Sequence, residues 1–346
     1  MKYQIDKQFL IDCFKEIVSV PSPVGYYRQL NPVLEQYAAK YGKTVTYDNR
    51  STAYITLDGE DNSKTVLVGA HADTIGMVVR KIDSDGKIRV RAMGGIIYSS
   101  LEGETVYLCT RDGRTYSGLM ACQAHSSHAF TGMRDVPRNE DTMMIILDEN
   151  VKSKDDVLAL GIRPGDIVSA EPHAILTEKG FLKSRYIDDK GPVACAFTML
   201  KYLTDHQLKP KYRTILAFPY SEEVGGGGAF VPENVSEYLA IDIVPLGPDT
   251  DCDEHCVVIC AADSKGPYDY DLTSRQLDYA EKAGCDCSIQ LAKHYSTDAN
   301  AAVISGNNLR GAAFGMPVYC SHGMERTHMD GLENTVGLML AYVLDI

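Results

Sequence analysis

Apolar positions along this chain repeat in two ways, one typical of helices and one typical of strands. Asp6 can cap a helix in which apolar residues recur at helical spacing, as Leu10 and Phe14 do. The apolar run at 64–70 is instead continuous, as in a buried strand. Strand and helix signals alternate along much of the chain. The strand signals lie at 213–219, 238–244, 256–261, 286–292 and 311–320, and the helix signals lie at 29–41, 192–203, 271–283 and 331–346. This alternation predicts an α/β fold with a mostly parallel central sheet flanked by helices.

The middle of the chain has a different pattern. Between 76 and 168 the helical periodicity fades, and two Asp-Gly pairs, Asp85-Gly86 and Asp112-Gly113, separate runs rich in strand-forming residues. Asp-Gly between such runs is a strong hairpin signal. We therefore predict a small β-barrel domain at 76–168, inserted into an α/β domain that comprises 1–75 and 169–346.

Charge and composition exclude several classes of protein. The chain has 346 residues with 34 basic and 47 acidic ones, a formal charge of −13, which argues against nucleic-acid or anionic-membrane binding. No apolar run is long enough to span a bilayer, and the first residues lack the pattern of a signal peptide. The ten cysteines are scattered, which favours reduced thiols in the cytoplasm. Cys252, Cys256 and Cys260 lack the paired spacing of structural zinc ligands, so we interpret them as buried thiols.

Candidate metal-binding side chains occur in five short segments. The first four segments follow a predicted strand or begin the helix after one, and ligands bind at the carboxyl ends of strands in open α/β sheets. A fifth segment, GMERTHMD, supplies a second histidine. The candidates are His71 and Asp73, Asp188 and Asp189, Glu222 and Glu223, Asp242, and His328.

Each segment alone also has a plain structural interpretation. Asp73 can be a turn residue, and Asp189 can cap the following helix. Asp242 is harder to explain in this way, because it lies in the apolar run LAIDIVP, where a carboxylate without a partner is costly. Glu222 and Glu223 precede four glycines, which suggests backbone packed closely against a site.

Together these residues suit a pair of divalent cations. Two histidines and three carboxylates are appropriate ligands for Zn, Co or Mn. A carboxylate between two cations holds them roughly 3.5–4 Å apart, the spacing of two-metal hydrolases. Such a pair activates a water, and a further carboxylate then takes the proton of the water and passes it to the leaving amine.

The order and spacing of these segments resemble those of the co-catalytic dinuclear-metal aminopeptidases of the glutamyl, deblocking and tetrahedral type. The resemblance runs along nearly the whole chain and includes the segments GIRPGD at 161–166 and Ser-Thr-Asp-Ala at 296–299. It implies a zinc-peptidase-like fold and a metal-dependent aminopeptidase with two divalent ions per subunit. The implied substrates are peptides with a free N-terminus. Members are commonly cytoplasmic homo-oligomers, often dodecamers, which implies an oligomerisation or substrate-access role for the barrel.

The resemblance also implies how the metal ligands divide. By position, Asp188 bridges both metals, His71 and Asp242 complete one site, and Glu223 and a final histidine complete the other. Spacing from the Gly-x-Pro start of the last strand favours His328 over His322 as that final ligand, and both remain open.

Two further roles are implied by the resemblance. Glu222 is expected to be the general base and acid that acts on a metal-bridging water. Asp73 is expected to hydrogen-bond His71 and to fix its tautomer.

Some residues depart from the family pattern and leave the substrate pocket open. Thr74 replaces an acidic residue, Lys190 begins an altered helix start, and glycines fill 225–228. Lys190 and Arg326 are candidates for attracting an acidic substrate side chain near the rim. Two other functions stay open: a related two-metal deacylase or carboxypeptidase, and a non-catalytic assembly protein on the same scaffold.

Overall fold

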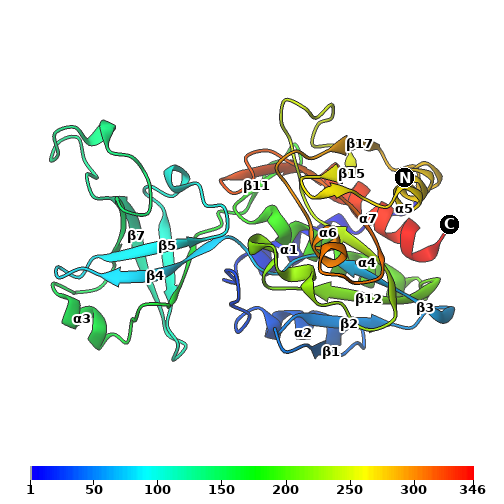
Figure 1. The fold of residues 1–346 in the computed structure, drawn as a ribbon, viewed down its shortest axis with the longest axis horizontal. Helices are drawn as coiled ribbons and strands as arrows, with labels where there is room; N and C mark the ends of the chain where they lie inside the picture. Colours follow the sequence, from blue (N-terminus) through cyan, green and yellow to red (C-terminus); the bar gives the residue numbers. More distant parts are fainter. Residues whose placement is uncertain (1) are drawn as a thin grey trace. The chain divides into compact units, whose positions relative to one another are not determined.

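The computed structural model describes residues 2–346 and divides into two compact units. One unit combines Met1–Asp73 with His173–Ile346, and the other is Thr74–Pro172. In Figure 1 the second unit is the cyan to green part of the ribbon. The boundaries expected from the sequence lie a few residues from these.

The larger unit is built on a mixed sheet that is parallel at its centre. Within the described residues its strands, in spatial order, are β1 (Val45–Tyr47), β2 (Ala53–Leu57), β12 (Tyr212–Phe218), β3 (Asp61–Gly69), β13 (Val235–Ile241), β18 (Arg310–Gly315), β15 (Val257–Asp263) and β16 (Gly266–Pro267), and β17 (Cys287–Leu291) pairs with β15. The four central strands β12, β3, β13 and β18 run parallel to one another. This confirms the predicted α/β fold class.

Helices cover both faces of this sheet. They are α1 (Lys7–Val18), α2 (Asn31–Lys40), α4 (Ile187–Asp205), α5 (Tyr270–Ala283), α6 (Asp298–Ile304) and α7 (Met329–Leu344). Successive residues of a strand point to opposite faces. Accordingly, Phe218 of β12 stacks on Phe197 of α4 at 5.4 Å, while Ala217 packs in the apolar cluster that contains Ala302 of α6. As predicted, Asp6 caps α1, where its carboxylate accepts a hydrogen bond from the backbone N–H of Phe9 at 3.0 Å.

Short elements at the edges of the larger unit carry several candidate residues. β10 (Ile175–Leu176), β11 (Phe181–Ser184) and β20 (Glu325–His328) form a small antiparallel sheet, and β14 (Val244–Pro245) pairs with β19 (Pro317–Val318). The 3₁₀ turns η3 (Glu222–Val224) and η4 (Gly227–Ala229) follow β12. A Cβ on Gly228 would lie 2.0 Å from the backbone oxygen of Asp298, so this close approach requires glycine. This is the close backbone packing that the run of glycines predicted.

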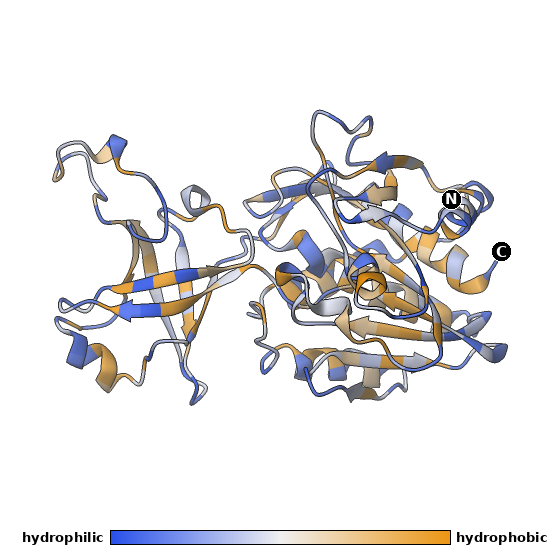
Figure 2. Ribbon diagram, viewed as in Figure 1, coloured by the Kyte–Doolittle hydropathy of each residue, from blue (hydrophilic) through white to orange (hydrophobic). Residues whose placement is uncertain are grey.

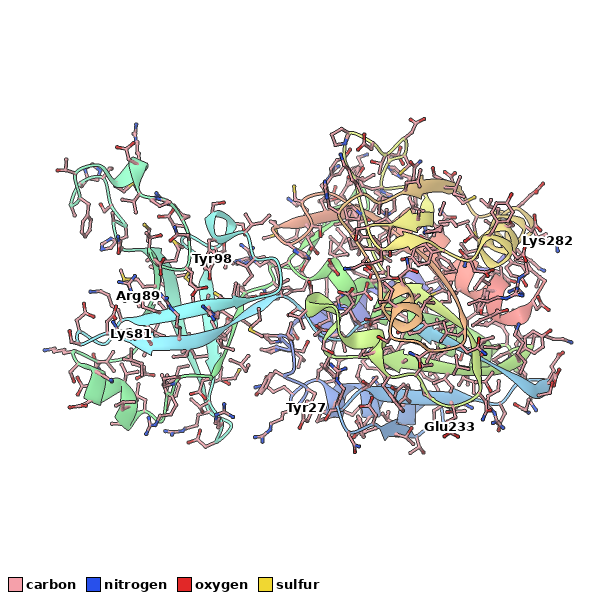
Figure 3. All side chains as sticks on the ribbon, viewed as in Figure 1. Tyr27, Lys81, Arg89, Tyr98, Glu233 and Lys282 are labelled. Carbon is pink, nitrogen blue, oxygen red and sulfur yellow. The ribbon has the colours of Figure 1, made fainter. Side chains whose placement is uncertain are left out.

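The smaller unit is a closed antiparallel barrel. Its strands are β4 (Gly76–Ile82), β5 (Ile88–Met93), β8 (Met143–Leu147), β7 (Thr115–Cys122), β6 (Thr105–Cys109) and β9 (Ile167–Ala170), and its short helices are η1 (Tyr98–Ser100), η2 (Met133–Asp135) and α3 (Lys154–Ala159). Both predicted Asp-Gly hairpins form, with Gly86 at φ 82° and Gly113 at φ 88°. Beside the first turn, Asp83 pairs with Lys81 at 2.9 Å and with Arg89 at 2.8 Å (Figure 3).

Each unit has its own apolar core. Figure 2 shows apolar residues, in orange, gathered on the strands and on α7, while most loops are hydrophilic. The interior of the barrel includes Val90, Leu108 and Ile145, all fully buried. Among residues 2–346, no helix has both the length and the apolar character that crossing a membrane requires.

Candidate metal centre

Three neighbouring parallel strands end beside the candidate residues. His71 lies just after β3, Glu222 and Glu223 lie just after β12, and Asp242 directly follows β13. Because β12, β3 and β13 are adjacent and parallel, their carboxyl ends form one edge of the sheet. The structure therefore brings together residues that lie far apart in the sequence.

Asp188 and Asp189 reach the same edge from the start of α4. The structure begins this helix at Ile187, earlier than the predicted start near 192, but Asp188 and Asp189 do not have helical dihedral angles. The peptide bond between these two residues is cis. Regular helix thus begins after Asp189, so Pro192 lies near the first regular turn, where proline is tolerated.

The first group of donor atoms contains His71, Asp188, Asp189 and Asp242. One donor atom from each lies within 4.8 Å of the others, and all four residues are buried. His71 Nδ1 lies 2.9 Å from the backbone oxygen of Asp73, which can only accept, so Nδ1 carries the proton. In the neutral ring, His71 Nε2 then turns its lone pair toward Asp188 Oδ1 at 3.0 Å. Two acceptors at this distance need a proton or a cation between them.

The second group contains Asp188, Glu223 and His322, whose donor atoms also lie within 4.8 Å of one another. His322 Nε2 lies 3.2 Å from Glu223 Oε2 and 3.6 Å from Asp188 Oδ2. Burial alone would lower the pKa of His322, but the adjacent Asp188 and Glu223 raise it to about 11. Asp188 belongs to both groups, with one oxygen facing each.

His328, the histidine favoured by sequence spacing, does not join either group, and His322 stands in its place. His328 lies at the far end of β20, where its Nε2 is 2.7 Å from the backbone oxygen of Lys179. His322 lies in the turn that precedes β20 and has a φ of 68°. The turn points its side chain toward Asp188, whereas the strand carries His328 away.

Asp73 acts mainly on the glutamate pair rather than on His71. Its carboxylate accepts the backbone N–H of Glu222 at 3.1 Å and that of Glu223 at 3.2 Å. Its carboxylate is 3.6 Å from His71 Nδ1, while its backbone oxygen takes the hydrogen bond. Asp73 thus fixes the His71 tautomer through its main chain, and its side chain holds the turn that carries Glu222 and Glu223.

Glu222 stands beside the donor groups without belonging to them. Its Oε2 lies 3.7 Å from His71 Nε2. Burial raises its pKa well above the ordinary value, and the carboxylate of Asp242 adds to this shift. A carboxyl group with a raised pKa in a site of this kind is suited to take and return a proton near neutral pH.

The balance of buried charge fits bound cations. Burial raises the pKa of Asp242 and of Asp189 well above their ordinary values. In the described part of the chain, Asp189 Oδ1 and Asp298 Oδ1 are buried and have no hydrogen-bond partner. Carboxylates in this position need positive charge nearby. Mixed imidazole and carboxylate donors suit Zn, Co or Mn, so the residues present fit divalent metal ions.

Two carboxylates of the centre received no metal-binding role from the sequence: Asp189 was a candidate without an assigned role, and Glu325 was not named. Asp189 joins the first donor group and accepts the backbone N–H of His71 at 2.9 Å. Glu325 accepts the backbone N–H of Asp188 and that of His322, both at 3.0 Å. Both residues lie in candidate segments, where a carboxylate close in sequence to a possible ligand was the available signal.

Lys190 proves to be structural. It is fully buried, and its Nζ donates to Ser22 Oγ and to the backbone oxygen of Ala72. Arg326 pairs with Glu254 at 2.6 Å. Neither cation is thus positioned as the expected attraction for an acidic substrate side chain.

Two overlapping groups of imidazole and carboxylate donors at the edge of an α/β sheet define a metal-dependent hydrolase. Comparison with known proteins identifies the family of hydrolases to which the chain belongs. The chain belongs to the M42 glutamyl aminopeptidase family, whose model matches residues 51–338. This confirms the resemblance seen in the sequence, and it makes the protein a metal-dependent enzyme that hydrolyses peptide bonds.

Individual relatives agree with this membership. The chain is 34% identical to "Putative aminopeptidase YhfE" of Bacillus subtilis (strain 168), over 96% of each chain. It is 22% identical to the lysyl aminopeptidase of Pyrococcus furiosus, over 97% of each. Among solved structures, the TET1 peptidase of Pyrococcus horikoshii superimposes with a TM-score of 0.86 at 25% identity, covering 97% of this chain and 100% of that one.

Proposed function

We propose that this protein is an aminopeptidase that works with two divalent cations. His71 and Asp242 would hold one cation, Glu223 and His322 the other, and Asp188 both. The observation that carries this proposal is the presence of Asp188 in both donor groups, with its Oδ1 facing His71 and its Oδ2 facing His322. A carboxylate shared by two cations would hold them at the short separation that two-metal hydrolases use.

Glu222 is the proton carrier in this proposal. Cations held by these residues would polarise the scissile carbonyl and lower the pKa of the attacking water. The Glu222 carboxylate takes the proton of the attacking water and delivers it to the leaving amine. Asp73 keeps this carboxylate in place, because it binds the backbone N–H of both glutamates.

Chelation tests the proposal directly. Protein stripped with a chelator is expected to lose hydrolysis of aminoacyl-p-nitroanilides and to regain it with Zn, Co or Mn, because the substrate carbonyl needs the cations. An N-acetylated peptide is the matched control, since an aminopeptidase needs a free α-amine. Release of acetate from that peptide at a comparable rate would point instead to the deacylase alternative.

The two histidines of the last segment make a matched pair of variants. His322→Gln is expected to lower kcat/KM by at least about 100-fold, because loss of a direct ligand exceeds the usual effect of a residue that only orients one. His328→Gln is expected to retain most of its activity per folded molecule, since His328 lies outside both donor groups. Steady-state kinetics with metal analysis checks both variants. A larger loss of activity and metal in His328→Gln than in His322→Gln would restore His328 as the ligand.

The metal-free protein should become less stable as the pH rises. Burial raises the pKa of Asp298 to about 6 and that of Asp73 to about 7. The contribution of such carboxyl groups to the stability of the fold is fully present below their unfolded pKa of about 4. This contribution is lost as the pH rises through their pKa in the folded state. We expect the Tm of chelated protein to fall between pH 4 and pH 7.5, and that of metal-loaded protein to fall much less. A pH-independent Tm after chelation would contradict this account.

We also propose that the protein assembles with copies of itself. The TET1 peptidase of Pyrococcus horikoshii can assemble into a tetrahedron or a large octahedral shell, and this chain matches all of that chain. Light scattering tests the assembly, and a monomeric mass at micromolar concentration would rule it out.

A further inference from the structure

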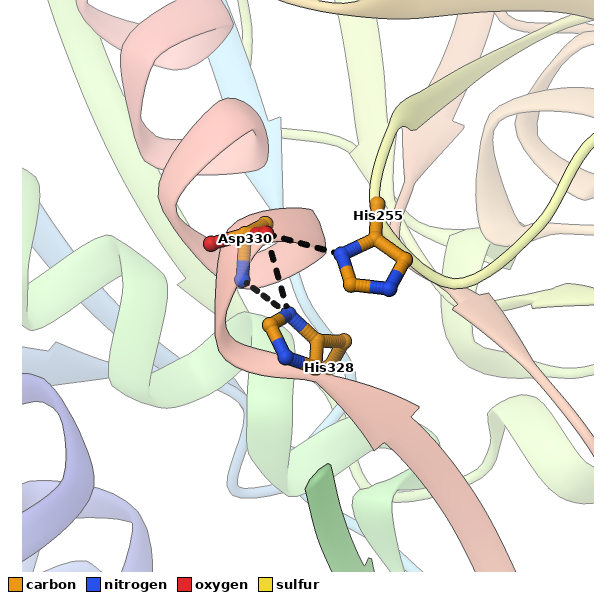
Figure 4. Close-up of side chains that lie close together, drawn as sticks. All are labelled: His255, His328 and Asp330. Carbon is orange, nitrogen blue, oxygen red and sulfur yellow. Dashed lines mark hydrogen bonds and ion pairs between the residues drawn. The ribbon is translucent and has the colours of Figure 1, made fainter. Parts of the chain in front are cut away.

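A second cluster of metal-binding side chains lies apart from the proposed catalytic cations. His255 lies in the loop before β15, His328 ends β20, and Asp330 lies in the first turn of α7. One donor atom from each lies within 4.8 Å of the other two (Figure 4). We propose that His255, His328 and Asp330 form a third divalent-cation site.

The spacing of the donors already suits one ion. Asp330 Oδ2 lies 2.8 Å from His255 Nδ1 and 3.2 Å from His328 Nδ1. Two ligands of a tetrahedral zinc ion, each about 2.0–2.1 Å from the metal, lie about 3.3 Å from each other. Small side-chain movements would therefore bring all three donors to bonding distance, with a fourth position left for water.

The tautomer of His328 places its lone pair on the nitrogen that faces the cluster. Its Nε2 lies 2.7 Å from the backbone oxygen of Lys179, which can only accept, so Nε2 carries the proton. Nδ1 is then the acceptor of the ring: it accepts the backbone N–H of Asp330 at 3.1 Å and lies 3.2 Å from the Asp330 carboxylate. A bound cation would take this lone pair in place of the N–H. Metal-binding histidines commonly donate their second N–H to a carbonyl in this way.

Neighbouring side chains hold the cluster and balance its charge. The ring of Phe181 meets the rings of His328 and His255 edge-on, at 4.8 and 6.0 Å. Arg326 lies 4.1 Å from the Phe181 ring centre, and its charge is paired with Glu254 at 2.6 Å. This pairing reduces the repulsion between Arg326 and a bound metal ion.

The three proposed ligands differ in how exposed their side chains are to solvent. The His328 side chain is only 9% exposed, whereas those of His255 and Asp330 are 41% and 47% exposed. A buried anchor with two accessible ligands lets an ion enter from solvent. Two imidazoles with one carboxylate favour Zn, Co, Ni or Cu over Mg or Ca, which prefer all-oxygen ligands.

Counting zinc in the loaded enzyme tests this site. Wild-type protein equilibrated with micromolar zinc is expected to hold one zinc per chain more than His255→Gln and than Asp330→Asn. His206→Gln is the matched control, because His206 is exposed at the end of α4. Equal zinc content in wild type and both variants would overturn the proposal.

The proposal does not rest on the catalytic assignment. Asp242→Asn should lower the zinc content at the catalytic centre and leave the difference between wild type and His255→Gln intact. Crystals of wild-type protein grown with zinc provide a second measurement that needs no variant. An anomalous peak within about 2.1 Å of His255, His328 and Asp330 is expected at the zinc edge, and its absence at full catalytic occupancy would also overturn the proposal.

Discussion

Glu222→Gln is expected to reduce kcat by about 10²–10⁴-fold, the range that a positioned general base contributes. Glutamine keeps the size of the side chain but cannot take a proton from water. Both donor groups exclude Glu222, so metal content should remain that of wild type. Steady-state kinetics and metal analysis on one preparation check the two halves of this expectation together.

Glu223→Gln is the matched control, because it makes the same chemical change at the neighbouring position. Glu223 lies in a donor group, with its Oε2 3.2 Å from His322 Nε2. This variant should lose metal as well as turnover, and added metal should restore part of its activity. Glu222→Gln should not respond to added metal. Full turnover by Glu222→Gln would show that another group moves the proton.

The fold was predictable because its signals are local. Asp85-Gly86 and Asp112-Gly113 specify hairpins through the left-handed conformation of their glycines, and both hairpins form. The alternation of apolar strands and amphipathic helices likewise indicated the parallel sheet. The pairing of β11 with β20 had no such signal, because it joins residues 141–147 positions apart, such as Phe181 and His328.

The candidate residues could be predicted where a polar side chain lies among apolar ones. Asp242 stands in a buried strand end, and this cost of burial pointed to a cation. The proposed last ligand, His322, followed a different rule. Cys320 and His322 both have positive φ, 59° and 68°, in a turn that the sequence does not mark with glycine at those positions. The direction of His322 depends on that turn, so counting along a strand led to His328 instead.

Asp189 shows a similar limit. As the second residue of an Asp-Asp pair before a helix, it has the sequence of an ordinary N-cap. In the structure its Oδ2 accepts the backbone N–H of His71. Its Oδ1 is buried and has no hydrogen-bond partner among the described residues. Its place in the centre follows from irregular backbone at 188–189. Such backbone depends on the packing of the whole site rather than on local preference.

Asp188→Asn is expected to weaken the binding of both proposed cations together. Each oxygen of Asp188 faces a different histidine, Oδ1 toward His71 at 3.0 Å and Oδ2 toward His322 at 3.6 Å. Asparagine keeps the shape but replaces one oxygen with an N–H donor and removes the charge. One of the two groups then loses a ligand, and both lose electrostatic attraction.

His71→Gln and His322→Gln provide the comparison, because each of these residues belongs to one donor group only. Metal titration by calorimetry should show a single weakened site in each histidine variant and two weakened sites in Asp188→Asn, with activity reduced by at least about 10³-fold, beyond the usual effect of losing one orienting partner. If Asp188→Asn weakens one site and leaves the other at wild-type affinity, Asp188 is a ligand of one ion, and the bridging carboxylate must be sought in Asp189.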